Sequence, residues 1–122
     1  MDPLHPIKLT AHPAGRPDID HPKPERLVVG NPKRETWNVV DGALAAGRAY
    51  CGVWRCEPGR WRIAMGATER ELFTVLEGRC RVHGPQGGFE EAGPGEAIYI
   101  PPGFIGEFEV LETVTKTYMI TD

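Results

Sequence analysis

The runs ELFTVLEG at residues 71–78 and GEAIYIPPG at residues 95–103 decide the fold class of this chain. Each is a short stretch of β-forming residues that ends in the glycine or proline typical of turns. Gly78 permits a tight hairpin, and Gly95 starts a strand after a turn. Residues 79–94, between the two runs, are short enough for a single hairpin. The region therefore predicts short antiparallel strands joined by turns.

Outward from these runs, β-rich segments alternate with turn signals along most of the chain. The 122 residues include 15 glycines and 12 prolines, which leave few stretches long enough for a helix of average length. We therefore predict an all-β barrel or sandwich of roughly nine short strands. The expected strands cover residues 36–40, 48–56, 60–65, 70–76, 79–83, 89–92, 96–100, 104–111 and 113–120.

The first 35 residues differ from the rest of the chain, because they contain seven of its 12 prolines. Proline lacks an amide donor and biases the residue before it away from the helical region. We expect residues 1–35 to form an extended, Pro-rich N-terminal arm, which lies along the main domain or along a neighbouring subunit. Residues 36–122 then form the β-barrel domain.

Composition and charge exclude several classes of function. The formal net charge is −3 and no long basic run is present, so nucleic acid is not an expected partner. No apolar stretch reaches the roughly 20 residues of a membrane span, and the N-terminus does not have the layout of a signal peptide. The three cysteines form no CxxC motif and are expected to be reduced, packed thiols. We predict a cytoplasmic protein with neither a nucleic-acid nor a membrane partner.

Three longer segments carry a family resemblance: GVWRCEPGRWRI at residues 52–63, ELFTVLEGRCRV at residues 71–82, and GPGEAIYIPPGFIGEFEVLETVTKTYMI at residues 93–120. Together they resemble the small single-domain branch of the cupins, which includes ureidoglycine aminohydrolase and ethanolamine-utilisation Q-type proteins. The sequence departs from the branch pattern mildly, at Glu96 for Asp and Phe108 for Trp. The resemblance implies a cupin-type double-stranded β-helix, that is, a jelly-roll barrel.

The metal ligands that the resemblance would imply are mostly missing. Metal-binding cupins place a His-x-His motif shortly before the glutamate that is Glu71 here, and a third histidine after the Pro-x-Gly glycine. Those positions hold Met65 and Ala67 (in another alignment, Ala64 and Gly66) and, for the third histidine, Gly106. One carboxylate does not replace three imidazoles around a divalent ion. We therefore predict a barrel with neither a metal nor another cofactor.

Strand alternation gives the expected interior. If Glu71 points inward, then Phe73 and Val75 do so as well, while Leu72 and Leu76 face outward. On the second motif the inward set is Phe104, Gly106, Phe108 and Val110, which leaves Glu107 and Glu109 in solvent. Because glycine replaces histidine at position 106, we expect a pocket there, lined by Phe73, Phe104 and Phe108 with Glu71 at its floor. A homodimer is expected to cover the two outward leucines.

A carboxylate inside a barrel needs a counter-charge, and the candidate cations for Glu71 are Arg62, Arg79, Arg81 and Lys116. Lys116 is the strongest candidate, because the resemblance associates the terminal V-x-K-x-Y pattern with ligand contact. We therefore assign tentative catalytic roles to Glu71 and Lys116. The residues expected to bind ligand are Phe73, Tyr99, Phe104, Phe108, Tyr118 and Arg62, although Tyr99 fits a subunit interface equally well.

Two classes of function are consistent with these residues. The first is a cupin that binds a small polar metabolite in its barrel without a metal ion, with or without turnover. The second, implied by the resemblance, is an enzyme of the ureidoglycine aminohydrolase type that acts on a ureido or amino acid metabolite. In the second class Glu71 is the general acid or base and Lys116 binds a carboxylate. A satisfied internal ion pair without catalysis would also explain the two charges.

Overall fold

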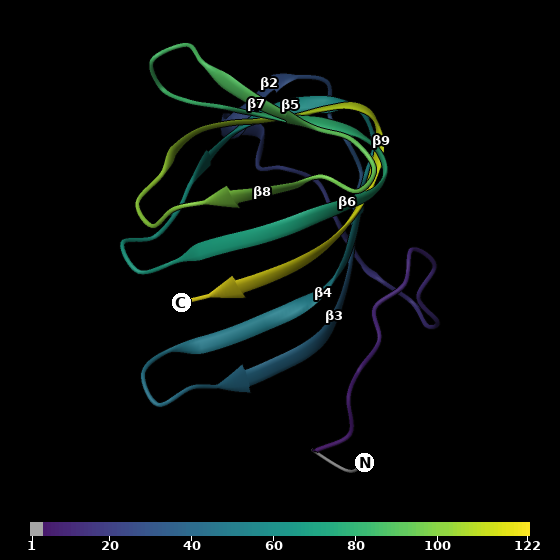
Figure 1. The fold of residues 1–122 in the computed structure, drawn as a ribbon. Helices are drawn as coiled ribbons and strands as arrows, with labels where there is room; N and C mark the ends of the chain where they lie inside the picture. The colour runs from purple at the N-terminus through teal and green to yellow at the C-terminus, as the bar shows by residue number, and fades with distance from the viewer. Residues whose placement is uncertain (1–3) are drawn as a thin grey trace.

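The computed structural model describes residues 4–122, which form a curled antiparallel β-barrel (Figure 1). In chain order its strands are β1 (Asp18–Asp20), β2 (Leu27–Val29), β3 (Arg34–Ala43), β4 (Arg48–Cys56), β5 (Gly59–Ala64), β6 (Arg70–His83), β7 (Phe89–Ala92), β8 (Ala97–Ile100) and β9 (Ile105–Thr121). The helix η1 (Pro24–Arg26) is a single 3-10 turn. Among residues 4–122, no helix is long and apolar enough to cross a membrane. The all-β jelly-roll prediction is confirmed.

Two long strands, β6 and β9, connect the two layers into which the single nine-stranded sheet curls. The first half of β9 pairs with β5, and its second half pairs with β4. Strand β6 pairs with β9 along most of its length, with β8 near its start and with β7 near its end. In Figure 1 both strands curve along one side of the barrel, from one layer to the other. Side chains on their inner faces therefore point into the barrel interior along both layers.

The prediction of a tight hairpin at Gly78 is wrong. Residues 70–76 and 79–83 belong to one strand, β6, whose register with β9 shifts on either side of this glycine. Gly78 has a φ of +82°, and an added Cβ would lie 2.1 Å from the carbonyl oxygen of Thr113. Such a glycine suits a bulge in a bent strand as well as a turn. The expected strands 104–111 and 113–120 likewise form one strand, β9.

The Pro-rich segment lies on the barrel of its own chain. Strand β1 pairs with β3 and β2 pairs with β5, which places them at the two ends of the strand order β1-β3-β4-β9-β5-β2. The indole nitrogen of Trp37 donates a hydrogen bond of 3.2 Å to the carbonyl of Gly15. The buried ring of Pro32 packs against Gly59, where an added Cβ would come within 2.7 Å of it. The segment thus contributes two short strands to the sheet edges.

The inward set of side chains follows the predicted alternation. Phe73 and Val75 on β6 are fully buried. Leu72, the residue before Phe73, points outward and is 53% exposed. On β9, Phe108 and Val110 are buried in the same core. Burial of such apolar side chains is the main favourable contribution to folding.

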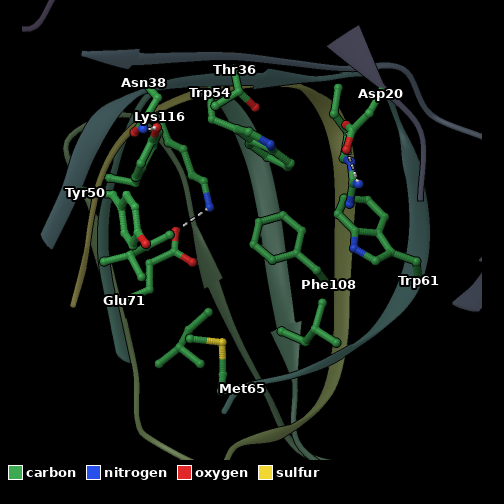
Figure 2. A pocket seen from close by; sticks show the side chains of 15 residues that line it. Asp20, Thr36, Asn38, Tyr50, Trp54, Trp61, Met65, Glu71, Phe108 and Lys116 are labelled. Carbon is green, nitrogen blue, oxygen red and sulfur yellow. Dashed lines mark hydrogen bonds and ion pairs between the residues drawn. The ribbon is translucent and has the colours of Figure 1, made fainter. Parts of the chain in front are cut away.

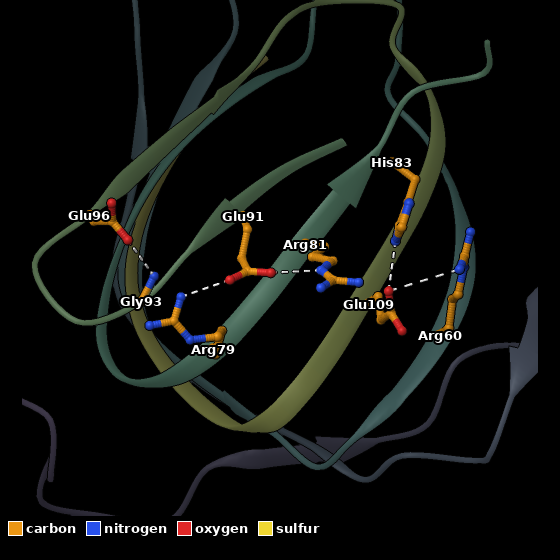
Figure 3. A network of polar contacts seen from close by, with 8 residues as sticks. All are labelled: Arg60, Arg79, Arg81, His83, Glu91, Gly93, Glu96 and Glu109. Atoms are coloured by element: carbon orange, nitrogen blue, oxygen red, sulfur yellow. Dashed lines mark hydrogen bonds and ion pairs between the residues drawn. The ribbon is translucent and has the colours of Figure 1, made fainter. Parts of the chain in front are cut away.

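The outer face of β5, β9, β6 and β7 carries charges of alternating sign (Figure 3). Arg81 and Arg79 donate hydrogen bonds of 2.7 and 2.8 Å to the two carboxylate oxygens of Glu91. These hydrogen bonds hold the pKa of Glu91 below its ordinary value. The expectation that Glu107 and Glu109 lie in solvent is wrong, because both pair with a cross-strand arginine and are only 27% and 22% exposed.

Candidate functional site

A cavity of about 360 Å³ opens inside the barrel, between the inner faces of β3, β4, β5, β6, β8 and β9 (Figure 2). Its volume lies within the range of small-molecule pockets. The polar and charged lining residues are Asp20, Arg34, Thr36, Asn38, Tyr50, Glu71, Lys116 and Tyr118. The apolar lining residues are Trp54, Trp61, Ile63, Met65, Ile100, Phe108 and Ile120.

Glu71 and Lys116 form an ion pair inside this cavity. The Lys116 ammonium donates to Glu71 Oε2 at 2.8 Å, and the two side chains are 6% (Lys116) and 12% (Glu71) exposed. The register explains the contact, because Lys116 pairs with Val75 across β6 and β9 while Glu71 lies four residues earlier on the same face of β6. The long lysine side chain spans this offset, and Figure 2 shows the Lys116 ammonium and the Glu71 carboxylate meeting in the interior.

Aromatic rings surround the Lys116 ammonium on its other sides. Its nitrogen lies 4.1 Å from the ring centre of Phe73, 4.5 Å from that of Trp54 and 4.8 Å from that of Phe108. The negative face of an aromatic ring attracts a cation, most strongly where water is excluded. The ammonium is therefore held by one carboxylate and three rings.

Gly52 in strand β4 has no side chain and so allows a second polar contact across the cavity wall. Gly52 lies between Asn38 on β3 and Tyr118 on β9 in the cross-strand register. An added Cβ at Gly52 would come within 2.9 Å of the Tyr118 hydroxyl and 2.0 Å of the Trp37 carbonyl oxygen. Because Gly52 has no side chain, the hydroxyl reaches over β4 and donates to Asn38 Oδ1 at 2.7 Å. Burial raises the pKa of Tyr118 to about 12, so this hydroxyl is a proton donor at neutral pH.

A second ion pair lies at the cavity rim. Arg34 on β3 donates two hydrogen bonds, of 2.9 and 2.7 Å, to the two carboxylate oxygens of Asp20 on β1. The guanidinium carbon lies 5.6 Å from the ring centre of Trp61, so the arginine rests on that indole. Such bidentate pairs have a defined geometry. The N-terminal segment therefore supplies a residue to the site, which the sequence did not indicate.

The structure brings together four of the residues that the sequence assigned to the site. Glu71, Lys116, Phe108 and Tyr118 line the cavity, and Phe73 lies beneath the lysine in the core. Their proximity is a matter of geometry, and their roles in binding or catalysis stay predictions.

Other assigned residues lie elsewhere. Arg62 is exposed and donates to the carbonyl of Glu25, while Arg79 and Arg81 bind Glu91 on the outer face. These three arginines therefore do not pair with Glu71. Tyr99 is 52% exposed on the outer face of β8.

The interior pocket expected beside Gly106 is not found among residues 4–122: the hollow that Gly106 lines also includes Arg60 and His83, but not Phe73, Phe108 or Glu71. A Cβ added to Gly106 would lie 2.7 Å from two ring atoms of Phe104 and 2.1 Å from the carbonyl oxygen of His83. The Phe104 ring thus fills the space that the missing side chain was expected to leave. The cavity instead lies deeper toward β3 and β4.

Several lining residues were missed by the sequence reasoning. Thr36, Asn38 and Tyr50 face the cavity from β3 and β4. Strand alternation through residues 48–56 could have placed Tyr50 and Trp54 on one face, since they are four residues apart. No residue of β3 is assigned to the site from the sequence alone, although the cross-strand register places Thr36 beside Trp54 and Asn38 beside Gly52.

The sequence also matches a known protein family. Residues 43–118 match the family model of the EutQ-like cupin domain. The chain belongs to the EutQ-like cupin family. No curated protein matches it in sequence.

Solved structures share the cupin fold at low identity. A Pseudomonas syringae protein of unknown function from the DUF861 family is 20% identical, with a TM-score of 0.76 over 93% of this chain and 46% of its own. This chain therefore spans less than half the length of that protein. A putative ethanolamine utilization protein Q from Salmonella typhimurium is 20% identical, with a TM-score of 0.62 over 72% of this chain and 68% of its own. The Clostridium difficile EutQ protein is 19% identical, with a TM-score of 0.59 over 74% of this chain and 63% of its own.

The side chains present do not fit the metal site of metal-binding cupins. Glu71 already binds an ammonium, and Met65 supplies a thioether where a ligating histidine would stand. The close approach of Phe104 and of the His83 carbonyl leaves no room for a histidine at Gly106. Among residues 4–122, no three His, Cys, Asp or Glu side chains gather in a way that could hold a metal ion. No step of the chemistry below runs through a metal.

Proposed function

We propose that this EutQ-like cupin binds a small polar metabolite in the barrel cavity without a metal ion. The observation that carries the proposal is the Glu71–Lys116 pair, which faces a cavity of about 360 Å³. Only Oε2 of Glu71 is used by the lysine, so Oε1 is left to accept a hydrogen bond from a ligand. Buried polar atoms that face a cavity are the groups that orient a bound ligand.

The two ends of the cavity differ in character. Thr36 and Asn38 line one end of the cavity from β3 and Met65 lies at the other end (Figure 2), while Ile63 and Ile100 add further apolar lining. A molecule with one hydrogen-bonding side and one apolar side would satisfy both ends. The ligand is therefore expected to be small and amphipathic.

A cavity-filling variant tests this proposal. Met65→Trp places a large ring in the cavity, and Ile105→Trp is its control because Ile105 is 64% exposed outside it. A panel of small polar metabolites is screened by thermal shift, and hits are measured by calorimetry on protein whose metal content has been determined. We expect hits to bind the metal-free protein and the control but not Met65→Trp. Binding that survives Met65→Trp, or that requires added metal, would refute the proposal.

A second candidate function is hydrolysis of a ureido or amino acid metabolite. The free Oε1 of Glu71 favours it, because a carboxylate that faces a cavity can take a proton from water or from a substrate. With the donor set described above, Glu71 would have to act without a metal-bound water. Release of ammonia from such metabolites, abolished in Glu71→Gln and retained in the exposed-site control Glu112→Gln, would support the enzyme. If no ammonia is released from any of these metabolites, the enzyme function is rejected and binding without turnover remains.

We further propose that the protein forms a homodimer through the outer face of β8, β6, β9 and β4. Tyr99, Leu72, Met119 and Cys51 are cross-strand neighbours on this face, and the first three are 51–53% exposed. A contiguous row of exposed apolar side chains favours a partner surface. A second copy offers the same row, as in a two-fold interface. The cytoplasmic location and the lack of nucleic-acid and membrane partners stay predictions from the sequence.

A further inference from the structure

The charges that line the cavity cancel within it. Glu71 is paired with Lys116 at 2.8 Å, and Asp20 is paired with Arg34 through two hydrogen bonds. The described lining contains no other acidic or basic side chain. From this we infer that the ligand of the barrel is uncharged and carries a hydrogen-bond donor and an acceptor. The inference rests on the proposed binding function and specifies its ligand class.

An anionic ligand is disfavoured because the Lys116 ammonium is already surrounded. One carboxylate oxygen and the faces of Phe73, Trp54 and Phe108 occupy its vicinity. A carboxylate ligand would have to compete with Glu71 for the same ammonium. Success would leave the Glu71 carboxylate buried without a partner, and that is costly.

A cationic ligand is disfavoured for the complementary reason. Glu71 Oε1 faces the cavity, but the Lys116 ammonium 2.8 Å from Oε2 cancels most of the attraction that a second cation would feel. At the rim, Asp20 is likewise neutralised by Arg34. Neither carboxylate therefore offers an uncompensated negative charge.

The polar atoms that remain suit an uncharged group. Glu71 Oε1 is an acceptor, and the Asn38 amide nitrogen is a donor because Tyr118 already occupies Asn38 Oδ1. A hydroxyl, amide or similar group presents both a donor and an acceptor and gains hydrogen bonds without displacing either ion pair. The apolar lining then packs against the rest of the molecule.

Three nearly isosteric probes test the charge of the ligand. Benzamide is neutral, benzoate is an anion and benzamidine is a cation at neutral pH, and all three have the same planar ring. Binding is measured by shifts of the Trp54 and Trp61 indole resonances in NMR titrations of the full chain. We expect benzamide to bind about tenfold or more tightly than either charged probe, because only it leaves the ion pairs intact.

Two variants should change the preference in opposite directions. Glu71→Gln leaves an ammonium without its carboxylate, so benzoate should become the best probe. Lys116→Met leaves a carboxylate without its ammonium, so benzamidine should become the best probe. The exposed-site control Glu112→Gln should keep the wild-type order. The wild-type comparison stands even if one variant fails to fold.

The outcomes separate the inference from the function on which it rests. Tighter binding of benzoate or benzamidine than of benzamide to the wild type would overturn the inference and leave the binding function in place. An unchanged order of affinities in both folded variants would also overturn it. If none of the probes shifts either indole up to its solubility limit, the inference and the proposed cavity-binding function both fail.

Discussion

Replacing Glu71 by Gln is expected to destabilise the protein, because it removes the counter-charge of a buried ammonium. The side chains of the pair are 6% and 12% exposed, so little water is available to solvate the ion that remains. Breaking a buried pair by removing one partner typically costs about 3–5 kcal/mol. The three rings around Lys116 still stabilise its charge, which lowers the expected loss for Glu71→Gln to about 2–4 kcal/mol.

Removing the other partner of the pair should lower the free energy of unfolding more. Lys116→Met leaves the Glu71 carboxylate beside ring faces, which attract cations and not anions. We expect a loss of about 3–5 kcal/mol near neutral pH. The double variant Glu71→Gln with Lys116→Met removes both charges at once. Its loss should fall short of the sum of the single losses by about 2 kcal/mol or more.

Urea denaturation followed by tryptophan fluorescence measures these free energies of unfolding. Glu112→Gln is the matched control, because this carboxylate lies exposed on β9, the strand that carries Lys116, and it should change stability by less than about 0.5 kcal/mol. If the double variant equals the sum of the single variants within about 0.5 kcal/mol, the two residues are not energetic partners, and the polar centre described above is wrong.

Four further outcomes test other parts of the structure. Gly106→His should destabilise the fold without creating a zinc site, because its Cβ would meet the His83 carbonyl oxygen at 2.1 Å; zinc bound stoichiometrically to a stable variant would contradict this. Cys56 and Cys80, which are buried and whose pKa values are raised to about 12 and 11 by desolvation, should react with a thiol reagent only after unfolding, whereas Cys51, on the proposed dimer face, should react without unfolding only once the subunits are separated. Light scattering should show a dimer that Leu72→Glu converts to a monomer, and a monomeric wild type at micromolar concentration would reject the interface. The melting temperatures of wild type and Glu91→Gln should differ most above pH 4.5, the ordinary value of this carboxyl group, and converge as pH falls through its lowered pKa; a difference that is constant with pH would reject the role of the pairs with arginine.

Much of the barrel could be predicted from local sequence. Turn residues at short intervals marked β4, β5, β7 and β8 closely, because glycine and proline restrict the backbone wherever they occur, whereas residues 36–40 cover only the middle of β3. Alternation on β6 placed Phe73 and Val75 inside and Leu72 outside. The bend at Gly78 was misread as a turn, since the same positive φ serves both and only the partner strand distinguishes them. The strands β1 and β2 were missed because proline-rich segments carry no strand periodicity.

The candidate site, too, could be predicted only in part from the sequence. Glu71 and Lys116 were found because both belong to patterns of the resembled cupin branch, Glu71 to the strand motif at residues 71–78 and Lys116 to the terminal V-x-K-x-Y. Asn38 and Asp20 were not found, because their positions depend on which strands pair and in which register. The gap at Gly52, which joins Tyr118 to Asn38, is visible only when three strands are aligned.

The ion pair connects the stability of this barrel to the charge of its ligand. Without the histidines of metal-binding cupins, Glu71 has no metal charge to balance it, and Lys116 supplies that balance from the neighbouring strand. The same contact that makes each single substitution costly also keeps the cavity neutral. The variants that destabilise the protein most through this pair should therefore be those that reverse its preference among the charged probes. The double variant, which recovers stability, should prefer the neutral probe again, and a double variant that favours a charged probe would separate the two effects.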